Sequence, residues 1–339
     1  MRNIYLKTTD EKEAIKIFHE NLKEFFERKE TEIVEVSKLL GRISAKSVFS
    51  KTSSPAFHSC AMDGVMIESK ITKQARENKP LYIKNSDFEF CNTGQYLKKP
   101  YDSVIMIEDI KVEEDKIVIL NPVRPWENVR IQGEDVIEKD LIYTAYHEFS
   151  AVDLSVLKSC GVTEVEVLKK PIIGIIPTGD EIINSNKAQL GKILESNSQM
   201  LKAMSEEIGA SAKIYDIAKD DESILKQSVL KAVDECDFIV VIAGSSAGSK
   251  DYTLKVLKDL GEVYVHGISI KPGKPAILGK IKDKPFVGLP GFPVASHIVF
   301  DNFVITTILK KLKKSRPQKQ IIKGFLTKQV ISSLKNTEY

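Results

Sequence analysis

The stretch PIIGIIPTGDE, residues 171–181, decides the fold of this chain. Its first half is apolar enough for a strand that is buried on both faces, and its second half is a glycine-containing loop. Two later stretches repeat this design, DFIVVIAGSSAGSKD at 237–251 and PFVGLPGFP at 285–293. Patterns typical of capped helices lie between the strand-like runs. This alternation predicts a doubly wound α/β domain over residues 171–314, with a parallel sheet covered on both faces.

The rest of the chain shows other sequence patterns. Residues 10–29 place apolar side chains on one helical stripe, and we assign segments 1–46 and 145–170 to a helical first domain. Residues 47–144 contain short β-like runs separated by Pro and Gly, which predicts a small, mostly β domain. The basic tail, 315–339, contains one or two strand-like runs, and two strands alone are marginally stable in water. We therefore interpret the tail as the start of a truncated β domain, the alternative being a tail that packs on the α/β domain.

The composition is that of an ordinary globular protein. Of the 339 residues, 42% are hydrophobic and 29% are charged, and the net charge is +3. These values exclude an intrinsically disordered chain and give no support for a nucleic-acid partner. No run approaches the ~18 apolar residues of a membrane span, and the charged N-terminus does not resemble a signal peptide. The four cysteines are too widely spaced for a disulfide framework, which favours a reducing, cytoplasmic location.

Ligands of doubly wound domains bind at the carboxyl ends of the strands, where the loops of this chain carry polar residues. In the first loop, Thr178 and Gly179 allow a tight turn after a buried strand. Asp180 and Glu181 then project where a metal or a polar ligand would lie. The alternative is a carboxylate that caps a helix, which is common for Asp after a strand.

The later loops favour an anionic ligand. The Gly/Ser loop at 243–251 lets backbone N–H groups approach a phosphate, and a helix that starts after it adds a favourable dipole. Asp251 could cap that helix or hold Mg²⁺ against the phosphate. Lys271 and Lys274 flank a Pro-Gly turn, and two close ammonium groups require an anion nearby. With the stiff wall GLPGFP at 288–293, these loops predict an enzyme that handles a phosphorylated or oxyanionic ligand.

A further candidate site lies in HSCAMDGV, residues 58–65. His58, Cys60 and Asp63 are each able to do chemistry. No other Cys or His has ligand-like spacing near them, so a zinc site has almost no support. We assign His58 and Cys60 first to packing or to support of the residues around the site, which leaves Asp63 as the residue of interest.

Taken in order, the motifs resemble the molybdopterin molybdenumtransferase family, the group of MoeA and the gephyrin E domain. The resemblance runs from about residue 10 to about residue 312 and rests on PAFHSCAMDG, CNTGQYL, DSVIMIED, NVRIQGEDV, IPTGDEI, ESNSQML, AGSSAGSKDYT, IKPGKPAILGK and GLPGFPVAS. It implies an elongated first domain, a small β domain, a MogA-like α/β domain and a C-terminal β-barrel, here incomplete. It also implies insertion of molybdate into adenylated molybdopterin with release of AMP, dependent on Mg²⁺, by a homodimer whose active site lies between the subunits.

The resemblance also implies roles for individual residues. Asp63, Glu181 and Asp251 match catalytic acids, and Glu181 and Asp251 match the acids near Mg²⁺. Substrate binding is carried over to a larger set, namely Thr93, Gly94, Asp135, Thr178, Gly179, Asp180, Gly244, Ser245, Ser246, Gly248, Lys271, Lys274, Pro290 and Gly291. The two lysines of this set suit the charges of molybdate and phosphate.

This sequence departs from the family pattern at three places. It has His58-Ser59-Cys60 where Asp-Asn-Ser is common, Val65 where Tyr is common, and Gly267 where a lysine is common. The loss of one cationic group leaves tungstate open as an alternative to molybdate. Two other functions also remain open, a molybdopterin adenylyltransferase, whose Gly-Gly-Thr-Gly loop is absent here, and a non-catalytic scaffold. An adenylyltransferase of molybdopterin is the expected pathway partner, and no nucleic-acid or membrane partner is expected.

Overall fold

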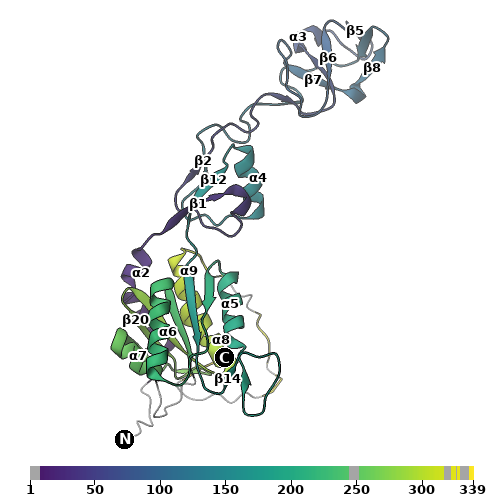
Figure 1. The fold of residues 1–339 in the computed structure, drawn as a ribbon. Coiled ribbons are helices and arrows are strands. Elements are labelled where there is room, and N and C mark those ends of the chain that lie inside the picture. Colours follow the sequence, from purple (N-terminus) through teal and green to yellow (C-terminus); the bar gives the residue numbers. More distant parts are fainter. Residues whose placement is uncertain (1–7, 244–251, 317–321, 326, 329–335) are drawn as a thin grey trace. The chain divides into compact units, whose positions relative to one another are not determined.

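The computed structural model describes residues 8–243, 252–316, 322–325, 327–328 and 336–339 (Figure 1). Contacts divide the chain into two compact units, one formed by Met1–Glu32 with Leu168–Tyr339 and the other by Ile33–Val167. The first two helices are thus grouped with the α/β unit, whereas the sequence patterns assign them to a separate first domain.

Six strands form the central sheet of the α/β unit, in the order β16-β13-β17-β21-β20-β18. The first four run parallel to one another, as the strand–helix alternation predicts. The apolar side chains of β13, β17 and β21 are almost all buried, which explains why these three strands read as continuous hydrophobic runs. The strands are β13 (Ile172–Pro177), β16 (Ser211–Ile214), β17 (Phe238–Ala243), β18 (Glu262–His266), β20 (Ile277–Ile281) and β21 (Lys284–Pro290).

One edge of the sheet differs from the expected all-parallel arrangement. Strand β20 runs antiparallel to both β21 and β18. Only Lys282 and Asp283 separate the paired residues Ile281 and Lys284, and a two-residue link can join only antiparallel strands. Lys282 has a φ of 56°, the left-handed conformation that such hairpin turns require. The expectation of parallel strands was therefore wrong at this edge because it ignored the length of the link.

Helices cover both faces of the sheet (Figure 1). Ile239 and Val241 of β17 point into a hydrophobic cluster that they share with α6 and α7. The alternate residue, Val240, is buried on the opposite face, where α5 and the C-terminal helical run pack. The helices are α5 (Asn197–Glu207), α6 (Glu222–Glu235), α7 (Tyr252–Leu260), α8 (Pro293–Val299) and α9 (Thr306–Lys311), with a π-helical turn over Phe300–Ile305 between the last two.

Two short helices at the start of the chain, α1 (Glu11–Glu20) and α2 (Lys23–Glu27), are fixed to this unit by charged side chains. Arg28 binds Asp237 and Asp283 at 2.6 Å each, and both acids lie at ends of sheet strands. Lys311 of α9 donates to the carbonyl oxygens of Phe25 and Arg28, which are free because α2 ends there. Burial is the main cause that lowers the pKa of Lys311 to about 8.

The smaller unit contains two antiparallel sheets of three strands, β6-β4-β7 and β5-β9-β8. Both contribute to one hydrophobic cluster, with Val65 and Ile105 from the first sheet and Ile83 and Ile117 from the second. The strands are β4 (Gly64–Ile67), β5 (Leu81–Lys84), β6 (Phe88–Cys91), β7 (Ser103–Met106), β8 (Ile110–Glu113) and β9 (Lys116–Ile119).

The remaining elements of this unit form two-stranded pairs and short helices. The Ser150 hydroxyl and the Asp153 carboxylate form a capping box at the start of helix α4. The pairs are β1 (Thr31–Glu35) with β12 (Glu164–Leu168), β2 (Val48–Phe49) with β11 (Leu141–Tyr143), and β3 (Ser59–Cys60) with β10 (Val129–Arg130). The helices are α3 (Ser69–Thr72) and α4 (Ala151–Ser159).

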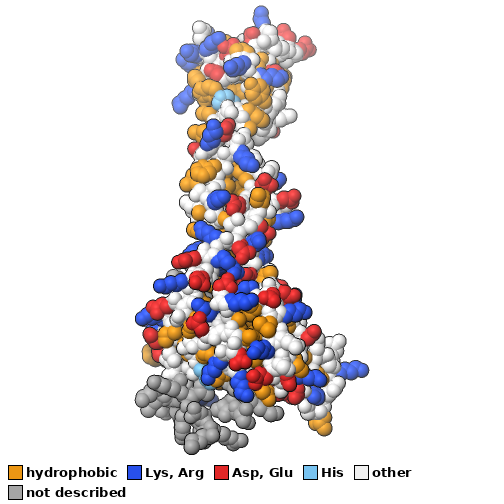
Figure 2. Space-filling model, turned by 60° about the vertical axis from the view of Figure 1, so that its left-hand side comes forward, with side chains coloured by type: hydrophobic (Ala, Val, Ile, Leu, Met, Phe, Trp, Pro, Cys, Tyr) orange, Lys and Arg blue, Asp and Glu red, His pale blue; other side chains and the backbone are white. Residues whose placement is uncertain are grey.

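Four further strands belong to the α/β unit. They are β14 (Ile182–Ile183) with β15 (Ile193–Leu194), and β19 (Ile270–Lys271) with β22 (Thr337–Glu338). The last described residues of the tail therefore pack on the α/β unit, which was the alternative to a separate β domain. No helix in the described part of the chain has both the length and the apolar character to span a membrane. On the face shown in Figure 2, basic and acidic side chains of the described residues are interspersed.

The pH dependence of unfolding tests how α1 is anchored. His19 lies 3.1 Å from the Thr307 hydroxyl, and burial, together with the charge of Lys310, lowers its pKa to about 4. Because the unfolded chain protonates His19 near pH 6.5, it binds more protons than the folded chain between pH 6.5 and pH 4, and stability falls as the pH falls through this window.

We expect the wild type to lose roughly 1–3 kcal/mol more unfolding free energy between pH 7 and pH 4 than the His19→Gln variant. Urea denaturation at both pH values measures the difference. Equal losses in the two proteins would show that His19 is not buried as a neutral ring.

Candidate active site

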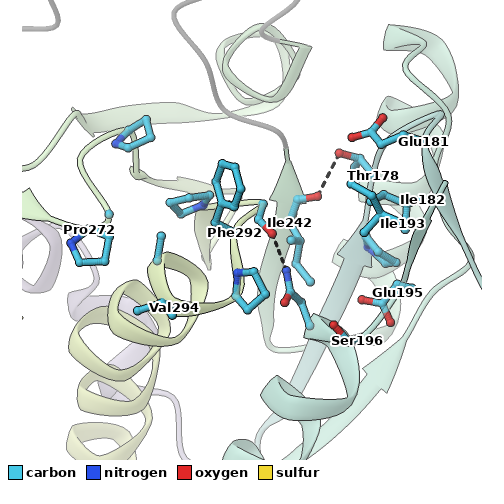
Figure 3. A pocket seen from close by; sticks show the side chains of 18 of the residues that line it. Thr178, Glu181, Ile182, Ile193, Glu195, Ser196, Ile242, Pro272, Phe292 and Val294 are labelled. Carbon is cyan, nitrogen blue, oxygen red and sulfur yellow. Dashed lines mark hydrogen bonds between the residues drawn. The ribbon is translucent and has the colours of Figure 1, made fainter. Parts of the chain in front are cut away.

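A pocket forms where three neighbouring parallel strands end. The cross-strand pairs Pro177–Ile242 and Ala243–Pro290 place the carboxyl ends of β13, β17 and β21 at one edge of the sheet. Loops from this edge, the start of α5 and the KPGKP loop line a cavity of about 850 Å³ (Figure 3). This volume lies within the range of small-molecule sites, and the position is the one that parallel sheets use for ligands.

The two adjacent acids of the TGDE loop, Asp180 and Glu181, have different surroundings in the structure. Thr178 donates both its backbone N–H and its hydroxyl to the carbonyl oxygen of Ile242, at 2.9 and 3.0 Å, and so closes the end of β17. Gly179 has a φ of 135°, which side chains rarely adopt. After this turn Glu181 lines the pocket, whereas Asp180 accepts a backbone N–H from the loop before α6. Of the two acids, Glu181 is therefore the candidate for contact with a ligand.

The KPGKP loop brings both predicted lysines to the pocket. Lys271 and Lys274 line it, and both side chains are exposed. Gly273 has a φ of 122°, and a Cβ atom there would lie 2.9 Å from a methyl group of Val299 on α8. The loop thus turns tightly over α8 because residue 273 lacks a side chain. Two ammonium groups on one wall of a cavity favour an anionic ligand.

The GLPG loop is held by two side chains that the sequence patterns did not single out as functional. Asn197 donates its amide N–H to the carbonyl oxygen of Gly291 at 2.7 Å, and Ser296 donates its hydroxyl to that of Pro290 at 2.5 Å. Pro290, Gly291 and Asn197 all line the pocket. No local sequence pattern indicates this bond, since it joins segments that are 94 residues apart.

A group of apolar side chains forms another part of the pocket wall. Ile182 and Ile193 come from the β14–β15 arm, while Phe292 and Val294 come from the start of α8 (Figure 3). Phe292 is 83% exposed, an unusual state for an aromatic side chain that serves only packing. Sequence reasoning missed this wall, since short apolar runs in loops carry no motif. The pocket therefore combines cationic and apolar surfaces, which suits a ligand with both rings and anionic groups.

The smaller unit holds the AMDG and NTG motifs together. One carboxylate oxygen of Asp63 accepts the backbone N–H of Thr93 at 2.7 Å and its hydroxyl at 3.1 Å. Gly94, which follows with a φ of 82°, donates its N–H to the carbonyl oxygen of Cys60. Asp63, Thr93 and Gly94 are thus adjacent in the smaller unit. The second oxygen of the exposed Asp63 carboxylate has no hydrogen bond to another described residue.

Asp135 lies in a neighbouring loop with its own partners. Its carboxylate accepts from Arg130 at 2.7 Å, and Arg130 also binds Glu134. His58 accepts the backbone N–H of Gln132 in this loop through Nδ1, at 3.0 Å. His58 therefore supports this loop through a hydrogen bond.

Five of the predicted site residues belong to the Gly/Ser loop. Gly244, Ser245, Ser246, Gly248 and Asp251 lie outside the described residues. Among the described residues, no three His, Cys, Asp or Glu side chains come together as a metal site would require. The Asp63 group and the pocket belong to different compact units.

Comparison with known proteins identifies both halves of the chain. Residues 9–161 match the family model for the MoeA N-terminal region (domain I and II), and residues 174–310 match that for a probable molybdopterin binding domain. A putative molybdopterin biosynthesis protein of Methanocaldococcus jannaschii is 34% identical, over 91% of this chain and 82% of the relative. A molybdopterin molybdenumtransferase of Haemophilus influenzae is 29% identical, over 83% of this chain and 73% of that protein.

Solved structures agree with this result. The crystal structure of a molybdopterin biosynthesis MoeA protein from Pyrococcus horikoshii superposes with a TM-score of 0.78 at 30% identity, covering 91% of this chain and 81% of that one. The chain therefore belongs to the MoeA family.

Alanine substitutions at two glycines test the packing around Asp63. A Cβ atom at Gly64 would lie 1.9 Å from the carbonyl oxygen of Ile105 on the paired strand β7, so Gly64→Ala must separate the strands. At Gly94 a Cβ atom meets nothing within 4 Å, and only the positive φ opposes a side chain. We expect Gly64→Ala to cost about 3 kcal/mol or more, and Gly94→Ala about 1 kcal/mol. Thermal unfolding measures both, and equal shifts would contradict the close approach at Gly64.

Proposed function

We propose that this member of the MoeA family inserts molybdate into adenylated molybdopterin and releases AMP. The observation that carries the proposal is the pocket of about 850 Å³, which combines the two lysines of the KPGKP loop with an apolar wall. Relatives named molybdopterin molybdenumtransferase, 27–29% identical over more than four-fifths of this chain, support the same activity. The substrate has the matching chemistry, since it joins two ring systems through a charged pyrophosphate.

In this proposal the lysines bind the oxyanion. Lys271 and Lys274 lie in one short loop, and their exposed ammonium groups are able to reach a ligand in the pocket. A tetrahedral dianion between them offsets their mutual repulsion and receives hydrogen bonds from both. Tungstate has the same shape and charge as molybdate, so it would bind through the same two groups.

The apolar wall binds a ring of the substrate. Ile182, Ile193 and Phe292 present flat or branched apolar surfaces toward the cavity (Figure 3). A planar heterocycle buried against them gains the usual free energy of apolar burial. The bond from Asn197 to Gly291 holds the apolar wall in place relative to the KPGKP loop.

The described part of the pocket offers one free carboxylate to Mg²⁺, an ion that proteins commonly hold through one or two carboxylates together with phosphates of the substrate. The acidic side chains that line the pocket in the described part of the chain are Glu181 and Glu195, and carboxylate oxygens are the ligands that Mg²⁺ prefers. Glu195 already accepts the N–H of Ser198, so Glu181 is the better candidate, together with Asp251. When bound, the ion would neutralise charge on the pyrophosphate as it is cleaved.

Asp63 supplies the remaining acid. Its bonds to Thr93 fix one carboxylate oxygen and leave the other to orient the oxyanion or to accept a proton during cleavage. We further propose that the protein is a homodimer, in which Asp63 of one subunit serves the pocket of the other. An adenylyltransferase of molybdopterin would supply the substrate.

Substitution of the lysines tests the oxyanion site. We expect Lys271→Ala and Lys274→Ala each to raise the molybdate concentration for half-maximal AMP release by about tenfold, because each loses a charge-assisted hydrogen bond. Lys202→Ala is the matched control, since Lys202 is a half-exposed lysine on α5 and is not among the pocket-lining residues. AMP release that does not depend on molybdate in the wild type would refute the proposed reaction.

The Asp63→Asn variant tests the acid. An asparagine oxygen can still accept both bonds from Thr93, so the local fold should be kept while the charge is lost. We expect turnover to fall by about 100-fold or more, with the melting temperature unchanged within error. A large drop in melting temperature would instead make Asp63 a structural residue. Binding of adenylated molybdopterin without turnover in the wild type would favour a scaffold.

A further inference from the structure

The C-terminal segment of the chain lies against the lysine loop of the pocket. Strand β22 (Thr337–Glu338) pairs in parallel with β19 (Ile270–Lys271). The backbone N–H of Thr337 donates to the carbonyl oxygen of Ser269 at 2.9 Å, and that of Tyr339 donates to the carbonyl oxygen of Lys271 at 3.1 Å. These bonds bracket Glu338, which therefore stands directly opposite Lys271.

The side chain of Tyr339 anchors this segment to the helices of the α/β unit. Its hydroxyl donates to the Glu11 carboxylate on α1 and accepts the amide N–H of Asn302 at 2.8 Å. Asn302 also donates to Glu11 at 2.8 Å, so the three side chains form a closed set. Partial burial, followed by the bond to Glu11, raises the pKa of Tyr339 to about 12, so the hydroxyl keeps its proton at pH 10, where a free tyrosine is half ionised.

The side chain of Glu338 faces one of the two lysines of the pocket. A carboxylate oxygen of Glu338 lies 3.7 Å from Nζ of Lys271. The Glu338 side chain is only 26% exposed, whereas that of Lys271 is 67% exposed. An anion that approaches Lys271 from the pocket therefore meets a lysine that already has a carboxylate beside it.

We propose that Glu338 is an internal competitor for the anion site at Lys271 and thereby sets its affinity for the oxyanion substrate. This inference rests on the proposed function, which assigns Lys271 to the oxyanion. The competition is non-covalent: a bound dianion replaces Glu338 as the partner of Lys271, or binds against its charge. Because β22 and Tyr339 tether the carboxylate, its effective concentration at Lys271 is high. Because the Lys271 side chain is 67% exposed, solvent weakens the pair, which lowers the affinity without abolishing binding.

Binding of molybdate to the full chain tests this proposal. We expect Glu338→Gln to tighten binding by about twofold to fivefold, the range that one exposed ion pair allows. The gain should shrink in high salt, which screens the same pair. Glu206→Gln is the matched control, because Glu206 forms a comparable exposed pair with Lys202 on α5 and does not line the pocket. Equilibrium dialysis with quantified molybdenum measures all three proteins.

Two more variants separate the ways in which the proposal could fail. Tyr339→Phe removes the anchoring hydroxyl but keeps Glu338, so it should also tighten binding. If Tyr339→Phe weakens binding and Glu338→Gln leaves it unchanged, the segment supports Lys271 instead of competing with the anion, and the inference is overturned. The Lys271→Ala variant tests whether Lys271 binds the oxyanion at all. Unchanged molybdate binding in that variant would refute the role that the proposed function gives to Lys271. Weaker binding in Lys271→Ala, together with no effect of Glu338→Gln, would overturn only the competition by Glu338.

Discussion

The register among β13, β17 and β21 is the constraint on which the pocket depends. Because Pro177 pairs with Ile242 and Ala243 with Pro290, the three strands end at the same edge, and their loops leave the sheet side by side. Thr178 then closes the end of β17 with two bonds. A slip of one residue would turn every buried side chain of a strand to the wrong face, so burial on both faces keeps this alignment. The same burial that stabilises the sheet therefore positions the site.

Local patterns in the sequence were sufficient to place the parallel strands, the helices between them and the loops that line the pocket. An apolar run followed by a glycine is a local signal, and so is a lysine pair across a Pro-Gly turn. Contacts between segments that are distant in the sequence have no such local pattern to predict them. The bond from Asn197 to Gly291 and the docking of Thr337–Glu338 on β19 join distant segments. The antiparallel edge was missed because the two-residue link at Lys282 was not weighed against the strand pattern.

Neighbouring residues in one motif have different roles, and the backbone decides between them. Asp180 and Glu181 are adjacent acids, but the turn at Gly179 directs only Glu181 to the pocket. In AMDG, Gly64 allows the close approach of β4 and β7, while Asp63 holds the turn at Thr93 through one carboxylate oxygen. A motif identified by resemblance thus contains residues with different surroundings. The contacts that each residue makes in the structure distinguish the residues of one motif from one another.

The central claim is that the lysine loop at the end of the sheet binds a tetrahedral oxyanion. The most direct test is the anomalous diffraction signal of crystals grown with AMP and tungstate, which stands in for molybdate as a dianion of the same shape. The account predicts one strong tungsten peak within hydrogen-bonding distance of Nζ of Lys271 and Nζ of Lys274. A single peak elsewhere, with no tungsten at this loop, would contradict it.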